Sequence, residues 1–193
     1  MKRKIYDSMQ KWKEENGRTA LLIDGARRVG KSYIAQEFAK KEYKSYILID
    51  FNRAPAEITD LFVHYLNDLN MFFLYLSNFY GVKLYERESL IIFDEVQLFP
   101  KARAAIKYLV EDGRYDYVET GSLMTIKKNV ADIVIPSEER HMKMYPLDFE
   151  EFLWALDNDT LMDFIRLCFE EKKPMGQVLH RKTILSSAGC RRL

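Results

Sequence analysis

Residues 20–32 read ALLIDGARRVGKS, an apolar run followed by a loop that is bounded by glycines and ends in Lys-Ser. The second part matches the pattern G-x-x-x-x-G-K-[ST] at every fixed position, as Gly25-Ala26-Arg27-Arg28-Val29-Gly30-Lys31-Ser32. The apolar run predicts a short buried parallel strand, and residues 31–41 have the apolar spacing of a helix. The pattern therefore lies between a strand and the start of a helix, which is the position that its chemistry requires.

This loop is the expected binding site for the phosphates of a nucleoside triphosphate. Its glycines allow a tight turn whose backbone N–H groups point at phosphate oxygens, next to a helix N-terminus that favours negative charge. We expect Lys31 to reach the β- and γ-phosphates, the Ser32 hydroxyl to bind Mg²⁺, and the rest of the loop with Tyr33 to contact the nucleotide. An ordinary strand–turn–helix is the alternative, but average composition gives such a match by chance only about once in a hundred chains of this length.

A second motif is LIIFDE at residues 90–95, four apolar residues followed by two carboxylates. Open α/β sheets bind their ligands at the carboxyl ends of the strands, where this pair is expected to lie. Asp94 is expected to hold Mg²⁺ through its waters, and Glu95 to orient and polarise an attacking water. Taken alone, the pattern also fits a strand that ends in solvated carboxylates. Its place about sixty residues after the glycine loop, with room for a strand and helices between, favours the functional interpretation.

A third motif, ETGS at residues 119–122, follows the next expected strand. A small hydroxyl there is expected to sense the γ-phosphate or to position water, and the spacing does not choose between Thr120 and Ser122. A plain turn is the alternative, because Thr, Gly and Ser are turn residues.

Arg140, in the sequence SEERH at residues 137–141, is a candidate to stabilise charge in the transition state of phosphoryl transfer. A surface arginine is the alternative, since the chain holds 30 lysines and arginines. The three histidines have no metal-ligand spacing, so no metal is assigned to them.

The rest of the chain alternates strand-like and helical patterns, which predicts right-handed crossovers and a parallel sheet covered on both faces. Residues 58–80 have helical spacing, as one helix or as two separated near Asn70. The fold class is predicted to be α/β, a three-layer P-loop NTPase with a central, mostly parallel five-stranded sheet. The other strands are expected at residues 46–51, 90–94, 115–120 and either 132–135 or 142–145.

Composition does not support several other classes of protein, although it does not exclude nucleic-acid binding through a local basic patch. The net charge of +1 does not support a general nucleic-acid or membrane-surface binder. Two unpatterned cysteines, Cys168 and Cys190, suggest neither a disulfide scaffold nor a zinc site. The N-terminal residues lack the apolar stretch of a signal peptide, and the longest apolar run, at residues 71–76, is too short to cross a bilayer. We therefore expect a soluble, cytoplasmic protein.

Together, ALLIDGARRVGKS, LIIFDEVQ, ETGS and the segment from Ser137 to Leu156 resemble a family of prokaryotic AAA-type ATPases. In that family a C-terminal domain of unknown function, with winged-helix character, follows the ATPase domain. The resemblance implies ATP as the nucleotide and an additional strand between the two nucleotide motifs, so that Glu95 adjoins the glycine loop. It also implies that Thr120 or Ser122 is the sensor and that Arg140 is an arginine-finger or sensor candidate. Gln97 belongs to the family's DE-x-Q signature.

The end of the chain departs from this resemblance. Family members run to about twice this length, whereas here a basic, serine-containing tail follows Lys182. We therefore expect an ATPase domain at residues 1–148, a helical extension toward a missing C-terminal domain at residues 149–182, and an irregular tail at residues 183–193. Helices at residues 149–173 are expected to expose apolar surface meant for the absent part.

The sequence thus predicts a magnesium-dependent ATPase that couples ATP hydrolysis to a conformational change, acting as a homo-oligomer or on an unknown protein client. A nucleotide-binding module without turnover, because of the truncation, is one alternative. A small-molecule P-loop kinase is another, but kinases usually lack the Asp94-Glu95 pair.

Overall fold

The computed structural model describes residues 2–122, 139–158 and 160–174. Residues 3–146 form one compact unit. The described residues from Leu147 onward, together with Lys2, belong to a second unit, and each unit is described by itself. The division falls between Pro146 and Leu147, while the domain boundaries expected from the sequence stay predictions.

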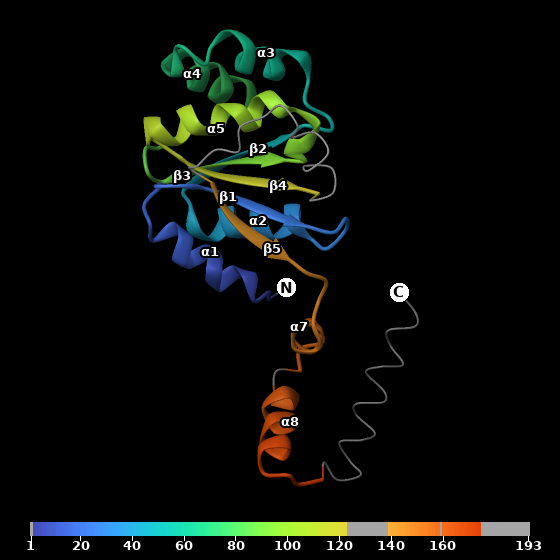
Figure 1. Ribbon diagram of the computed structural model, residues 1–193. Helices are drawn as coiled ribbons and strands as arrows, with labels where there is room; N and C mark the ends of the chain where they lie inside the picture. Colours follow the sequence, from blue (N-terminus) through green and yellow to red (C-terminus); the bar gives the residue numbers. More distant parts are fainter. Residues whose placement is uncertain (1, 123–138, 159, 175–193) are drawn as a thin grey trace. The chain divides into compact units, whose positions relative to one another are not determined.

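The first unit is built on one five-stranded sheet in the order β2-β3-β4-β1-β5, and all of its neighbouring strands are parallel (Figure 1). The strands are β1 (Ala20–Gly25), β2 (Ser45–Asp50), β3 (Ser89–Asp94), β4 (Asp116–Gly121) and β5 (Glu139–Met144). This confirms the predicted α/β class, with a sheet that is entirely rather than mostly parallel. Of the two positions expected for the last strand, residues 142–145 overlap β5, while residues 132–135 lie outside the described ranges.

Helices cover both faces of this sheet. On one face lie α1 (Ile5–Lys13) and α2 (Lys31–Glu42), and on the other lie α3 (Ala56–His64), α4 (Leu69–Tyr80) and α5 (Pro100–Asp112) (Figure 1). The helical pattern at residues 58–80 is therefore two helices. The second begins after Asp68, whose side chain accepts a hydrogen bond from the Met71 backbone N–H at 3.1 Å.

The burial of each strand follows its place in the sheet. Every residue of β1, β3 and β4 is buried, because these three strands are covered on both faces and flanked by neighbours. The edge strand β5 is different, since only Met142 and Met144 are buried and both face the α1–α2 side. For this reason the second half of its sequence, HMKM, alternates between exposed polar and buried apolar residues.

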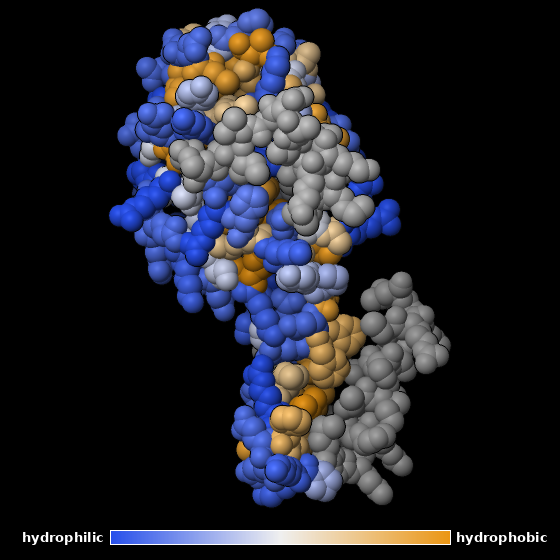
Figure 2. Space-filling model, in the orientation of Figure 1, coloured by the Kyte–Doolittle hydropathy of each residue, from blue (hydrophilic) through white to orange (hydrophobic). Residues whose placement is uncertain are grey.

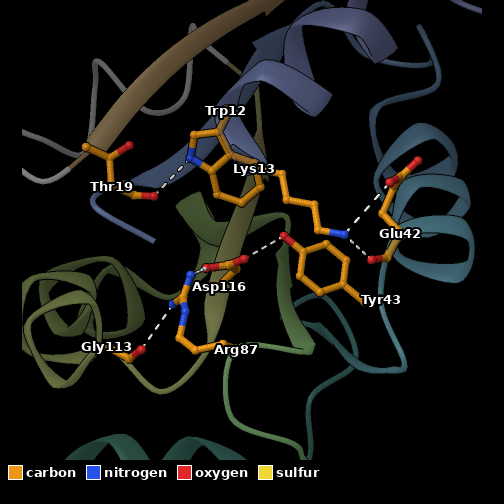
Figure 3. A network of polar contacts seen from close by, with 8 residues as sticks. All are labelled: Trp12, Lys13, Thr19, Glu42, Tyr43, Arg87, Gly113 and Asp116. Atoms are coloured by element: carbon orange, nitrogen blue, oxygen red, sulfur yellow. Dashed lines mark hydrogen bonds and ion pairs between the residues drawn. The ribbon is translucent and has the colours of Figure 1, made fainter. Parts of the chain in front are cut away.

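The amino ends of the strands are held by a polar network that involves no nucleotide motif (Figure 3). Asp116 of β4 is buried and accepts hydrogen bonds from Tyr43 Oη at 2.7 Å and Arg87 Nη2 at 2.8 Å. Arg87 also donates to the Gly113 carbonyl at 3.0 Å. Burial, followed by the Asp116 charge, raises the pKa of the Tyr43 hydroxyl far above its ordinary value. The network at the amino end of the sheet therefore stabilises the fold, and the nucleotide motifs lie at the carboxyl ends of the strands.

The second unit contains α7 (Phe149–Ala155) and α8 (Thr160–Glu170). A capping box between Asp148 and Glu151 starts α7, and Arg166 of α8 donates to both carboxylate oxygens of Glu150, at 2.9 and 2.8 Å. Apolar side chains are exposed on both helices; they are Phe149, Phe164, Leu167 and Phe169. Figure 2 shows apolar surface on this unit, and its role in contacting an absent part stays a prediction. In the described parts of the chain, no helix combines the length and the apolar character that a membrane crossing needs.

Candidate nucleotide site

The glycine loop leaves β1 and enters α2 in a conformation that requires its glycines. Gly25 and Gly30 have φ angles of +156° and +96°, and Arg28 between them is also left-handed, at +64°. A Cβ built on Gly25 would lie 2.2 Å from the Met144 carbonyl oxygen, so β5 leaves no room for a side chain there. The helix then starts at Lys31 without a side-chain cap, which leaves its first N–H groups open to an anion.

Lys31 folds back over the loop. Its Nζ donates to the carbonyls of Ala26 at 2.8 Å and Gly25 at 3.2 Å. Burial lowers the pKa of this ammonium, while the carboxylates of Glu95 and Asp94 act in the opposite direction. A positive charge is thus held at the centre of the loop, between the backbone that would hold phosphates and the two carboxylates after β3.

Asp94 joins the motifs from three elements. Its Oδ1 accepts a hydrogen bond from Ser32 Oγ at 2.7 Å and another from Thr120 Oγ1. Thr120 Oγ1 lies 3.4 Å from the Glu95 backbone N–H, which donates to it. Thr120 is therefore the hydroxyl that contacts the carboxylate pair, whereas Ser122 follows the end of β4 and is half-buried.

The donor set around Asp94 fits Mg²⁺. The hydroxyl of Ser32 and the carboxylate of Asp94 are hard oxygen ligands, and they already lie within hydrogen-bonding distance of each other. The residues that the structure describes contain no group of three His, Cys, Asp or Glu side chains arranged to hold a metal. Mg²⁺ needs no such cage, because it is commonly bound by one or two protein oxygens, waters and substrate phosphates.

Glu95 follows Asp94 in a left-handed conformation, with φ of +54°. This conformation is uncommon for a residue with a side chain and is found more often at functional sites. Gln97, which is buried in the short helix η1 (Val96–Leu98), donates a hydrogen bond from Nε2 to Glu95 Oε2. The backbone turn and this amide together fix where the Glu95 carboxylate lies.

A cavity of about 430 Å³ opens beside this carboxylate pair. Sequence reasoning identified Asp94, Glu95 and Arg27 on its wall, but not the group at the carboxyl end of β2. That group consists of Asp50, Asn52 and Arg53. The register Asp50↔Asp94 places the ends of β2 and β3 side by side, which brings the group to the site. A signal was present in the sequence, because polar residues directly after a predicted parallel strand share this edge with the other motifs.

Arg140 is the candidate that the structure does not bring to this edge. It is the second residue of β5 and pairs with Leu21 near the start of β1, at the amino end of the sheet. There it forms an ion pair with Glu15 of the segment after α1. A role at the nucleotide site of its own chain does not follow from this position. Tyr33 is at the site's edge, exposed in the first turn of α2.

The fold and the loop define the class of this protein, a nucleotide-binding P-loop protein of the NTPase type. A family model described as an AAA domain matches residues 17–153, which is most of the chain. The chain belongs to this AAA domain family, whose members bind ATP. The resemblance drawn from the motifs is thereby confirmed for the ATPase domain, while the C-terminal domain and the truncation stay predictions.

Three known proteins are similar to this chain to different degrees. The uncharacterized protein MJ1637 of Methanocaldococcus jannaschii is 22% identical over 157 residues, which are 80% of this chain and 32% of that protein. Among solved structures, the Walker-type ATPase PABY2304 of Pyrococcus abyssi is similar with a TM-score of 0.52 and 18% identity, over 91% of this chain and 60% of that one. PCH-2 of C. elegans is less similar, at a TM-score of 0.43 and 11% identity, over 84% of this chain and 46% of that chain. The chain thus spans about a third of its curated relative and three fifths of the Pyrococcus ATPase.

Proposed function

We propose that this protein is a magnesium-dependent ATP hydrolase whose turnover drives a conformational change. The observation that carries the proposal is the hydrogen-bonded cluster of Ser32, Asp94, Thr120 and Glu95, which joins α2, β3 and β4 beside the phosphate-binding loop. Hydrolysis at such a site depends on positioning and charge stabilisation rather than on covalent chemistry. The cluster supports the positioning, while Lys31 and a bound Mg²⁺ would supply the positive charge.

Lys31 and each residue of the cluster have a proposed role. Lys31 leaves its two carbonyl partners to bind the β- and γ-phosphate oxygens, because a charged oxygen is the stronger acceptor. Ser32 and Asp94 hold the metal ion, and bound Mg²⁺ would neutralise charge on the phosphates. Glu95 accepts a proton from, or orients, the attacking water. Thr120, which bridges Asp94 and the Glu95 backbone, senses the γ-phosphate through both.

The cavity beside Glu95 suggests a source for the remaining positive charge. Arg27 and Arg53 line it together with three carboxylates. Both arginines are exposed, so their guanidinium groups can turn toward an anion. We propose that Arg53 stabilises transition-state charge within its own chain, which is the role for which Arg140 was a candidate. Arg140 lies at the other end of the sheet. Arg140 acting from a second copy would require a homo-oligomer.

The test compares ATP binding and phosphate release in the wild type and two variants. Lys31→Ala is expected to lose binding, and Glu95→Gln to keep binding but lose turnover. Matched controls are Lys40→Ala, an exposed lysine in the last turn of the same helix, and Glu111→Gln, an exposed glutamate of α5. Both controls should behave as the wild type. Wild-type turnover that Glu95→Gln leaves unchanged would remove Glu95 from the mechanism.

A second candidate, a nucleotide-binding module without turnover, has one observation in its favour. The Gln97 amide occupies an oxygen of Glu95 that a water would otherwise contact. Tight Mg·ATP binding by the wild type with no phosphate release, in the presence of normal folding, would favour this candidate over the hydrolase.

A further inference from the structure

We propose that Arg3, a residue outside every motif, is a positioning residue that holds the glycine loop in its phosphate-binding shape and ties it to the end of β5. The proposal rests on the nucleotide-binding part of the proposed function. Arg3 precedes α1 and is only 4% exposed. Its guanidinium donates from Nη1 to the Val29 carbonyl at 2.9 Å and from Nη2 to the Tyr145 carbonyl at 2.7 Å.

The burial of Arg3 is the first sign of a specific task. Arginine is seldom buried, because its charge must be given partners to offset the loss of water. Its partners include two backbone carbonyls that lie far apart in the sequence, at separations of 26 and 142 residues. Hydrogen bonds from a charged donor are about twice as strong as neutral ones, and the planar fork of arginine fixes the direction of both.

The bond to Val29 acts on the phosphate-binding side of the loop through the geometry of the peptide unit. In a planar trans peptide, the C=O of Val29 and the N–H of Gly30 point in opposite directions. A donor that holds the carbonyl therefore aims the Gly30 N–H the other way. The Gly30 N–H is the last one before α2, and such amides are the groups that bind phosphate at a helix N-terminus. Arg3 also packs closely on Gly30, since a Cβ built there would lie 3.8 Å from Nη1.

The bond to Tyr145 connects the same loop to the end of β5. The residue before it, Met144, lies close to both glycines of the loop. Its carbonyl oxygen would be 2.2 Å from a Cβ built on Gly25, and its methyl carbon would be 3.7 Å from a Cβ built on Gly30. Both ends of the loop thus rest on the end of β5, and Arg3 fastens the loop there. The chain leaves the first unit directly after Tyr145, through Pro146. A change in the loop on nucleotide binding therefore acts on the segment that leads into the second unit.

The experiment uses the full chain with Arg3→Met and Arg3→Lys. Methionine keeps an unbranched apolar stem without donors, and lysine keeps the charge but has no fork to bind two diverging carbonyls. The control is Arg87→Lys, since Arg87 also donates to a carbonyl and a second acceptor, but at the amino end of the sheet. The measurements are thermal melting, affinity for Mg·ATP and for inorganic triphosphate with Mg²⁺, and amide hydrogen exchange of residues 26–32 and 145.

Both Arg3 variants are expected to weaken binding of Mg·ATP and of inorganic triphosphate by the same factor, about tenfold or more, because the loop's phosphate contacts are what they loosen. Amide exchange should become faster in the loop and at Tyr145. The control should lower the melting temperature and leave both affinities within about twofold. If Arg3→Met does not fold, Arg3→Lys decides.

A lower melting temperature with unchanged affinities and no selective exchange would show that Arg3 is structural only, and would overturn the proposal. None of these measurements needs hydrolysis. A wild type that binds but does not turn over ATP would therefore contradict the proposed hydrolase and leave the test of Arg3 intact.

Discussion

A methyl group added at Gly25 tests how tightly the glycine loop is packed against β5. The Cβ of an alanine there would lie 2.2 Å from the Met144 carbonyl oxygen and 3.2 Å from its carbonyl carbon. Ordinary contact begins at 3.4 Å, so the loop or the strand must retreat by roughly 1 Å, in an interior that has no spare space. Both obstacles are backbone atoms, which cannot be relieved by a change of rotamer.

The cost has two parts. A positive φ at a residue with a side chain costs about 1–3 kcal/mol, and overpacking of a filled interior adds about 1–3 kcal/mol. Gly25→Ala should therefore lower the free energy of unfolding by roughly 2–6 kcal/mol. In a chain of this size each kcal/mol corresponds to a fall in the melting temperature of about 2–4 °C. The variant should also bind Mg·ATP poorly, since the displaced residue opens the loop whose N–H groups are proposed to hold the phosphates.

Gly81→Ala is the matched control. Gly81 ends α4 with φ of +63°, and a Cβ built on it meets nothing within 4 Å. Only the backbone part applies there, about 1–2 kcal/mol. Urea denaturation and calorimetric titration with Mg·ATP measure both effects. If the two variants lose equal stability and both bind ATP as the wild type does, the inference that the loop packs closely against β5 is wrong.

Three further predictions concern other parts of the first unit. Because the pKa of Tyr43 is raised by burial and by Asp116, its folded hydroxyl stays protonated above pH 10 while the unfolded one ionises. The stability advantage of the wild type over Tyr43→Phe is thus complete below pH 10 and should shrink by about 1.4 kcal/mol per pH unit above it. Urea titrations at successive pH values measure this difference, and an advantage that stays constant would contradict a buried hydroxyl. Arg53→Ala should lower phosphate release at least about tenfold and leave ATP affinity within about threefold, and unchanged release would exclude its charge from the mechanism. Gln97→Ala should lower turnover about tenfold with binding retained, since the Glu95 carboxylate loses its orienting amide; an increase in turnover would instead mean that the amide restrains Glu95.

The elements around the glycine loop could be predicted because local patterns decide them. Strand β1 was expected at residues 20–24 and α2 at residues 31–41, and each extends one residue further in the structure. A buried parallel strand is apolar throughout, and a helix on a sheet repeats its apolar residues every three or four positions. Each of these two signals is contained in a short stretch of sequence. Neither requires knowledge of what the element packs against.

The choice between Thr120 and Ser122 could not be made in the same way, because it depends on how β4 pairs with β3. The register Phe93↔Glu119 puts the next residues, Asp94 and Thr120, side by side on the α2 face of the sheet. Thr120 and Ser122 are two residues apart, so both are expected on the same face, and a shift of two residues would have put Ser122 beside Asp94 instead. Register is a tertiary property and leaves no mark on the local spacing.

Arg3 and Arg140 show two different limits. No pattern predicts that Arg3 meets carbonyls 26 and 142 positions away, because both contacts exist only once the sheet has formed. For Arg140 a usable signal was present. A residue that precedes or opens a parallel strand lies at the amino edge of the sheet, whereas ligands bind at the carboxyl edge. With β5 starting at Glu139, Arg140 belongs to the wrong edge for a contact within its own chain.

The strand order explains why Thr120 is at the centre of the site. Strand β1 does not pair with β3, since β4 lies between them. Ser32, in the first turn of α2 after β1, must therefore reach Asp94 across the end of β4, and it does so at 2.7 Å. Thr120, at that end of β4, donates a hydrogen bond to the same Asp94 oxygen and accepts one from the Glu95 N–H, so it supports the turn at Glu95. A residue without a hydroxyl at this position would leave the Glu95 N–H without its acceptor. The topology thus gives a hydroxyl at this position a structural task, separate from the sensor role proposed for it.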